Sequence, residues 1–257
     1  MAQKAAASQT DAAKLNDDNM AKVSSGLMQG ATKLSALYAN AADPHQDPQA
    51  VRAALFQNRH DVAELNAAKT TFSALLDDQG VAIRNDLEQD SMAGQNLFKA
   101  FPSLVGAKNG LTTATGVFDL PPPPAPANRD WVAGMPVKKA DGSPAGIYIT
   151  GWTYRQYAAQ LQDTLRKRMS DDLEKAHSVA KLPVFYVLLF DDTGVYGTPL
   201  TPAVNESKMK DLDLPAKTAA GPVQGTITVD DRDFGYAAAR APSLGGDMGI
   251  AVMRSEL

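Results

Sequence analysis

The sequence of 257 residues contains no cysteine and only three histidines. The absence of cysteine excludes a disulfide framework and a thiol nucleophile, and it is compatible with an oxidising compartment. The histidines at 45, 60 and 177 have no partner at the spacing of a metal site, so no metal is expected. Catalytic motifs are missing too, since there is no G-x-S-x-G, no H-E-x-x-H and no phosphate-binding glycine loop. We therefore expect no cofactor and no catalysis by this chain.

Long apolar runs and a strong charge of one sign are also absent. Nothing approaches the roughly 18 consecutive apolar residues of a transmembrane helix, and the start, MAQKAAASQT, lacks the apolar core of a signal peptide. The formal net charge is -4, with 25 basic and 29 acidic residues, which offers no global attraction to nucleic acid or anionic lipid. Hydrophobic residues make up 44% of the chain, enough for a packed core. The polypeptide as given is expected to be soluble and globular, without a nucleic-acid partner.

An internal repeat organises the chain. The triplet RDW at 129–131 recurs as RDF at 232–234, an offset of 103 residues, and the same offset carries GI at 146–147 onto 249–250. In the first copy, strand-favouring residues flank an Asp-Gly pair at 141–142, which is typical of two strands joined by a turn. Two landmarks at one offset indicate a repeated structural unit.

A second pair of copies lies upstream of the first. DDQGV at 77–81 matches DDTGV at 191–195, an offset of 114 residues. The larger offset means that the second unit is shorter between its hairpins, where it lacks a proline run like that at 121–126. Loops absorb such deletions easily. Each unit is therefore predicted to be a hairpin, a helical crossover, a short strand and a hairpin, and the proline run is predicted to be an exposed, stiff connector.

Helical patterns precede and connect these units. Residues 10–38 carry apolar side chains at steps of three and four, which predicts a long N-terminal helix. It is either a surface helix packed on a sheet or a signalling stalk or dimer helix. Further helices are predicted at 49–65, in the crossover at 91–108, and between the units, where a basic run at 166–168 is balanced by acidic residues and indicates a solvated face.

This order of elements, with its DDQGV and DDTGV turns and final strands beginning GIYI and GIAV, resembles the double Cache sensor domain. That domain is the PAS-like extracytoplasmic region of bacterial chemoreceptors and sensor histidine kinases. The resemblance covers nearly the whole chain and implies an α+β fold. It has a long N-terminal helix and two tandem PAS-like modules, each a five-stranded antiparallel sheet with flanking helices. The implied division is a stalk helix at 1–42, a membrane-distal module at 43–152, a connecting helix at 153–181 and a membrane-proximal module at 182–257.

The same resemblance implies the periplasmic portion of an inner-membrane receptor, cut between two membrane spans that this sequence does not include. Such a fragment senses a small molecule in its distal module, and a kinase, where present, lies elsewhere in the full-length protein. A homodimer through the N-terminal helix is a candidate assembly. Of the family's amino-acid-binding core, Arg-x-Trp-Tyr, residues 129–132 keep only the Arg and the Trp, so the resemblance does not carry an amino-acid ligand onto this chain.

Strand alternation suggests candidate ligand-binding residues, if the pocket lies between one sheet face and the crossover that covers it. Trp131 and Met135 share a face of one strand, and Tyr148 and Thr150 share a face of its partner. The two hydroxyl groups suit a small polar ligand. Arg84 can hold a carboxylate through two parallel hydrogen bonds, which makes a carboxylate a candidate ligand. The full candidate set is Arg84, Phe101, Trp131, Met135, Tyr148 and Thr150.

Structural explanations compete with each of these assignments. Trp131 has its counterpart in Phe234, which favours a core aromatic, and the repeated Arg-Asp pair at 129–130 favours a structural ion pair or strand cap. A structural or protein-binding ectodomain without a small-molecule ligand is the alternative function. An enzyme using the aspartate pairs at 77–78 or 191–192 is a third hypothesis, although adjacent aspartates in turns usually serve turn geometry.

Overall fold

The structure is a computed structural model that describes residues 1–118, 129–177 and 181–256. The proline run at 121–126, predicted to be a connector, lies outside the described residues. The chain forms two compact units. The first-sheet unit is the name used for Asn19–Thr153. The second-sheet unit consists of Met1–Asp18 together with Tyr154–Leu257. The four-part division implied by the resemblance stays a prediction.

Helix α1 (Ala2–Leu34) gives residues to both units, because the boundary falls after Asp18. Its buried apolar residues, among them Val23 and Leu27, follow the steps of three and four that predicted it. The helix starts earlier than predicted because its first turns are rich in alanine, the best helix former. After Leu34 the backbone tightens into a 3-10 helix, η1 (Ser35–Ala41). No helix in the described part of the chain is long and apolar enough to cross a membrane.

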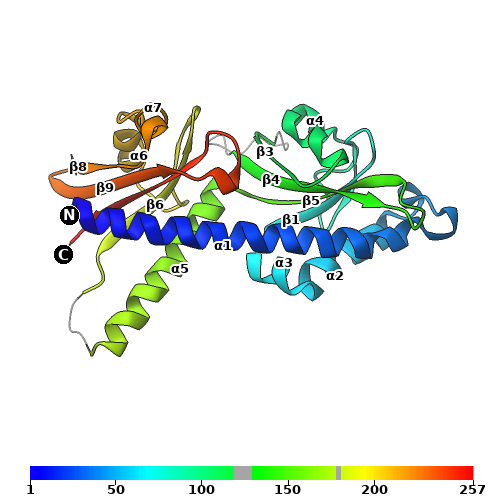
Figure 1. The fold of residues 1–257 in the computed structure, drawn as a ribbon, viewed down its shortest axis with the longest axis horizontal. Coiled ribbons are helices and arrows are strands. Elements are labelled where there is room, and N and C mark those ends of the chain that lie inside the picture. The colour runs from blue at the N-terminus through cyan, green and yellow to red at the C-terminus, as the bar shows by residue number, and fades with distance from the viewer. Residues whose placement is uncertain (119–128, 178–180, 257) are drawn as a thin grey trace. The chain divides into compact units, whose positions relative to one another are not determined.

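The first-sheet unit contains a five-stranded antiparallel sheet, as predicted (Figure 1). Its strand order is β2-β1-β5-β4-β3. Both hairpins expected from the repeat are present, and Gly142 supplies the positive φ, 83°, that the turn between β4 and β5 requires. The strands are β1 (Phe72–Leu76), β2 (Ala82–Asn85), β3 (Thr112–Gly116), β4 (Asp130–Lys138) and β5 (Pro144–Thr153).

Helices cover both faces of this sheet, with α1 on one side and the crossover on the other (Figure 1). The helix predicted at 91–108 is split into two short pieces, because Pro102 cannot continue the first. The helix predicted at 49–65 is also split, at Val62, whose backbone is extended. The helices of this unit, besides α1 and η1, are η2 (Pro44–Gln46), α2 (Pro48–Asp61), α3 (Ala63–Ala68), α4 (Leu97–Ala100) and η3 (Pro102–Lys108).

The second-sheet unit repeats the same strand order, β7-β6-β10-β9-β8. This one-to-one correspondence confirms the predicted repeat. Its strands are β6 (Val184–Asp191), β7 (Gly194–Tyr196), β8 (Val223–Val229), β9 (Arg232–Arg240) and β10 (Gly249–Ser255). Its helices are α5 (Tyr154–Lys175), α6 (Ala203–Lys210), α7 (Leu214–Lys217), η4 (Thr218–Ala220) and η5 (Pro242–Leu244).

The start of α1 packs into the second-sheet unit far from its neighbours in sequence. Asn16 Oδ1 accepts a hydrogen bond from the hydroxyl of Tyr157 in α5 at 2.9 Å. Ser8 Oγ accepts another from Arg254 in β10 at 3.1 Å. Residues from the first turns of the chain therefore complete the packing of its last strand.

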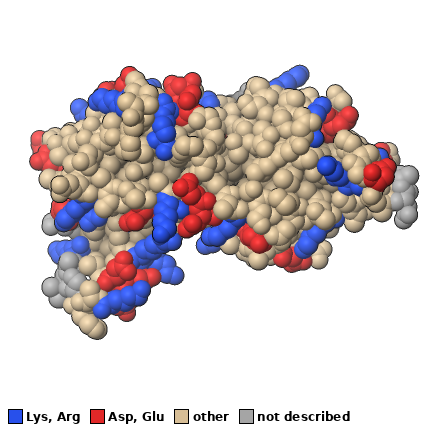
Figure 2. Space-filling model, viewed as in Figure 1, with Lys and Arg blue, Asp and Glu red and all other residues tan. Residues whose placement is uncertain are grey.

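Helix α5 is buried only along its first half, where its buried residues end at Leu165. The basic run at 166–168 lies in the exposed half, and both signs of charge lie there in Figure 2. Arg166 Nη1 is 3.8 Å from Asp163 Oδ1 on the same helix. This agrees with the predicted solvated face.

Candidate ligand-binding site

Strand register places five of the six predicted site residues on one face of the first sheet, and Arg84 belongs to this face because it pairs with Leu75, which pairs with Tyr148. Met135 pairs with Tyr148, and Trp131 pairs with Trp152. Thr150 is two residues beyond Tyr148 on the same strand and therefore points to the same side. The shared face predicted from alternation is confirmed by this register.

That face is covered by helices α1 and α2 and not by the crossover, which differs from the expectation. The ring of Tyr148 lies against α1 so closely that a Cβ on Gly30 would be 2.6 Å from its Cε1. Asn58 of α2 donates a hydrogen bond to the carbonyl of Gly30 at 3.0 Å. The side chains that meet the crossover are the neighbouring ones, such as Val132 and Ile149. Alternation establishes which residues share a face, but it does not say which helices cover that face.

The hydroxyl groups of Tyr148 and Thr150 are engaged inside the protein. Both residues are 0% exposed. Ser73 Oγ lies 3.3 Å from Tyr148 Oη and donates to Thr150 Oγ1 at 3.4 Å. Thr150 Oγ1 in turn donates to the carbonyl of Phe72 at 2.6 Å, and burial raises the pKa of Tyr148 to about 12. A ligand that contacted these hydroxyls would have to replace existing hydrogen bonds.

A buried ion pair completes this network. Asp86, 1% exposed, accepts a hydrogen bond on Oδ1 from the backbone N–H of Ser73 at 2.8 Å. Arg59 Nε of α2 is 2.7 Å from Asp86 Oδ2, and its Nη1 donates to the carbonyl of Thr70 at 3.0 Å. Burial raises the pKa of Asp86, against the lowering effect of the Ser73 N–H and of Arg59. The pair ties α2 to the sheet.

Arg84 is occupied by its own neighbours. Its Nη1 is 2.7 Å from Asp90 Oδ2, and its Nη2 donates to the carbonyls of Leu87 and Glu88, both at 3.3 Å. The side chain thereby holds the loop that follows β2. To bind a ligand carboxylate, Arg84 would have to release Asp90.

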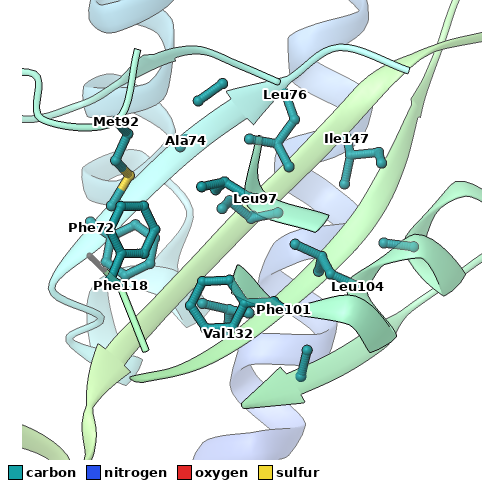
Figure 3. Close-up of a cluster of buried hydrophobic side chains, with 14 residues drawn as sticks. Phe72, Ala74, Leu76, Met92, Leu97, Phe101, Leu104, Phe118, Val132 and Ile147 are labelled. Carbon is teal, nitrogen blue, oxygen red and sulfur yellow. The ribbon is translucent and has the colours of Figure 1, made fainter. Parts of the chain in front are cut away.

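Phe101 lies on the other side of the sheet, in an apolar cluster between the strands and the crossover. Figure 3 shows its ring beside Val132, with Leu104 nearby and Phe118 in the same cluster. The rings of Phe101 and Phe118 have their centroids 5.8 Å apart. The structure therefore separates Phe101 from the other five predicted residues. The cluster also contains Phe72, Ala74, Leu76, Ala82, Met92, Leu97, Ala107, Ala114, Ile147 and Ile149.

Asp130 brings a carboxylate to this apolar side, although no sequence motif marks it as a site residue. It begins β4 two residues before Val132, is 8% exposed, and accepts a hydrogen bond from the Phe118 N–H at 3.3 Å. Burial raises its pKa to about 7, against the lowering effects of that N–H and of the charge on Arg129. Its counterpart in the repeat, Asp233, is exposed and accepts a hydrogen bond from Thr228. The two copies differ in burial, in hydrogen-bond partner and in sheet face, because Asp130 shares the side of Val132 in its apolar cluster, whereas Asp233 alternates with Phe234 of the second sheet's apolar cluster.

The aspartate pairs of the two DD turns have structural partners. Asp77 Oδ1 accepts hydrogen bonds from the N–H groups of Gln79 and Val81 at 2.9 and 2.8 Å. Asp191 Oδ1 accepts one from the Thr193 N–H at 2.8 Å. These are the turn roles expected of adjacent aspartates. Within the described ranges, no group of three or more histidine or acidic side chains is placed to hold a metal ion.

Comparisons with known proteins identify the fold. No protein-family model matches the sequence, and no curated protein matches it. Among solved structures, the ligand-binding domain of the Pseudomonas aeruginosa PAO1 amino acid chemoreceptor PctB, in complex with L-Gln, is similar with a TM-score of 0.54. It is 11% identical, and the match covers 99% of this chain and 91% of that one.

Two further chemoreceptor domains match this chain with similar TM-scores, sequence identities and coverages. That of Campylobacter jejuni Tlp3 with L-valine has a TM-score of 0.53 and 11% identity, covering 96% of this chain and 91% of that one. The ligand-binding domain of Pseudomonas fluorescens CtaA with L-isoleucine has a TM-score of 0.53 and 13% identity, and the match covers 95% of this chain and 87% of that one. The chain therefore has the fold of the ligand-binding domains of bacterial chemoreceptors, as its resemblance to the double Cache domain implied.

Proposed function

We propose that this chain is the extracytoplasmic ligand-sensing domain of a transmembrane signal-transduction receptor, a chemoreceptor or a sensor histidine kinase. On this proposal it is not itself catalytic, and it binds a small molecule in the first-sheet unit. The fold shared with three chemoreceptor ligand-binding domains supports the class of function. The proposed location of the ligand rests on the burial of Asp130, because its repeat counterpart, Asp233, is exposed.

A buried carboxylate is costly unless it is neutral or meets a cation. An apolar surrounding that raises its pKa is also the kind of environment found at functional sites. We propose that Asp130 receives the protonated amine of a ligand while Phe101 contacts its apolar part. Amino acids are the leading ligand class, because they combine this amine with the carboxylate anticipated from the sequence. The similar domains are described with L-Gln, L-valine and L-isoleucine, which supports this choice.

The other five residues selected from the sequence keep a narrower proposed role. Tyr148, Thr150 and Arg84 hold the sheet, its edge loop and the covering helices in place, and Trp131 and Met135 pack on the same face. Their substitution would change ligand affinity through the shape of the sheet. Signalling requires that ligand prefer one of two arrangements, and α1, which belongs to both units, is the proposed carrier of that change.

A thermal-shift panel of amino acids, amines and carboxylates tests this function. An amine-bearing ligand at 100 times its Kd is expected to stabilise the domain by about 2.7 kcal/mol. The ligand found in this panel should bind the Asp233→Asn variant with the affinity of the wild type in isothermal titration, because Asp233 is the exposed counterpart of Asp130. If no member of the panel binds, the alternative is favoured, a structural or protein-binding ectodomain in which Asp130 only caps the Phe118 N–H.

Homodimerisation through the N-terminal helix stays a prediction. Ala7, Thr10 and Ala21 are exposed and spaced to lie on one side of α1, outside the lining of any ligand site proposed for this chain. If this side forms the dimer seam, Ala21→Arg should convert a dimer to a monomer in sedimentation equilibrium, because small residues allow helices to pack closely. A wild-type domain that is monomeric at every concentration measured would contradict it.

A further inference from the structure

A hollow of about 540 Å³ lies on the surface of the first-sheet unit, away from Asp130. Its volume is within the usual range for small-molecule sites, roughly 300–1,000 Å³. Three segments line it: α1, the β4–β5 hairpin, and the turn at Asn109 and Gly110 that leads into β3. Ser35, which follows α1, donates a hydrogen bond to the carbonyl of Lys138 in the hairpin at 2.6 Å, so this wall is already joined to the hairpin.

The lining of this hollow combines an apolar surface with two cations. Met28 is 57% exposed, and Met135 and Pro136 lie beside it in the lining. The exposed side chains of Lys138 and Lys139 supply the positive charge, and no lining residue is acidic. Within residues 1–118, 129–177 and 181–256, neither lysine lies in an ion pair with a carboxylate.

A second hollow of about 580 Å³ provides an internal comparison, because Lys139 lines both. Asp43, Asp77 and Asp78 also line that second hollow. An anion entering that hollow would meet three carboxylates and the shared lysine, whereas one entering the first would meet two lysines, of which Lys139 also interacts electrostatically with Asp141 of the hairpin turn. The two cavities are of similar size, so charge favours the first for an anionic ligand.

We propose that the hollow between α1 and the β4–β5 hairpin binds a small amphipathic anion, an aliphatic carboxylate. Its carboxylate would lie between the ammonium groups of Lys138 and Lys139, and its alkyl chain would cover Met28 and Met135. This site is separate from the amine-binding site proposed at Asp130 and does not depend on it. Because α1 forms one wall and the hairpin another, a bound ligand would fasten the helix to the sheet.

Methyl NMR of the whole domain labelled at methionine ¹³C methyl groups tests this site with octanoate as the probe. The resonances of Met28 and Met135, assigned by Met→Leu substitution, should shift on titration. Met92, which is buried in the apolar cluster beneath the crossover, should not shift. Shifts at Met92 without shifts at Met28 would place the anion in the other site and overturn the inference. Failure of octanoate to shift any methionine would also overturn it, and would leave the amine site untouched.

The alkyl chain length of the carboxylate and the charge of the two lysines provide independent tests of the site. Affinity should rise from butanoate to octanoate by up to about fourfold per methylene, the value for complete burial. Lys138→Gln with Lys139→Gln should weaken octanoate binding roughly three- to tenfold, and added salt should weaken it as well. Lys99→Gln, at an exposed lysine outside the hollow, is the matched control and should bind normally. Equal affinity in the double variant and the control would overturn the proposal.

Discussion

Arg59→Met is expected to lower the free energy of unfolding by about 3–5 kcal/mol, because it leaves a buried charge without its partner. Asp86 is 1% exposed, and Arg59 Nε is 2.7 Å from its Oδ2. Burial already raises the pKa of Asp86, and loss of the guanidinium would raise it further. The unfolded chain would then ionise this carboxyl at a lower pH than the folded one. The loss should therefore be largest at alkaline pH and smaller in acid.

Urea denaturation followed by tryptophan fluorescence measures the free energy of unfolding of the first-sheet unit, which contains the ion pair. The chain has two tryptophans, Trp131 and Trp152, and both belong to the first-sheet unit. Arg52→Met is the matched control, since Arg52 lies on the same helix and donates one hydrogen bond to the Leu87 carbonyl. It should cost about 1 kcal/mol or less. An equal decrease in the free energy of unfolding in both variants would show that the ion pair contributes no more than an ordinary hydrogen bond. Adding Asp86→Asn to Arg59→Met should recover part of the stability.

Asp130→Asn is expected to stabilise the ligand-free domain at pH 8 and to leave it nearly unchanged at pH 4. The pKa of this carboxyl rises from its ordinary 3.8 to about 7 on folding. Between these values the unfolded chain loses the proton while the folded chain keeps it, so wild-type stability falls as pH rises and levels off above about 7. The full shift corresponds to about 4 kcal/mol, and burial of the new amide reduces the expected gain to about 1–3 kcal/mol.

The same substitution should cost the proposed ligand most of its affinity. Removing one partner of a buried charge pair costs about 2–5 kcal/mol, which weakens an amine-bearing ligand by roughly 30-fold or more. Urea titrations at pH 4 and pH 8 with isothermal titration of the ligand measure both effects. Asp233→Asn changes the exposed counterpart and should alter neither. Undiminished affinity in Asp130→Asn would show that this carboxyl only caps the Phe118 N–H.

The repeated sheets were predictable because their signals are local. Alternation over 131–138 and 145–152 anticipated β4 (Asp130–Lys138) and β5 (Pro144–Thr153) to within one residue at each end. Helix breaks were harder to predict. Pro102, which cannot continue a helix, interrupts the crossover. The extended backbone at Val62 interrupts the helix after the first loop, where apolar periodicity predicts no break.

The candidate site was predictable only in part, because burial is set by distant segments. Register placed Met135 opposite Tyr148, as alternation required, yet nothing in either strand says that α1 covers them. The two copies of the Arg-Asp pair look alike in sequence. Asp130 is buried and hydrogen-bonded to the Phe118 N–H, whereas Asp233 is exposed. No local pattern distinguishes these two environments.

The contact between the first turns of α1 and β10 can form only late in the synthesis of the second-sheet unit. Ser8 contacts Arg254 in β10, and Asn16 contacts Tyr157 in α5, so β10 must be synthesised before this end of the helix is fully covered. Contacts so distant in sequence form slowly. The first-sheet unit, closed by Thr153, can assemble earlier. A nascent chain halted after β9 would therefore still present the start of α1 to proteases and chaperones.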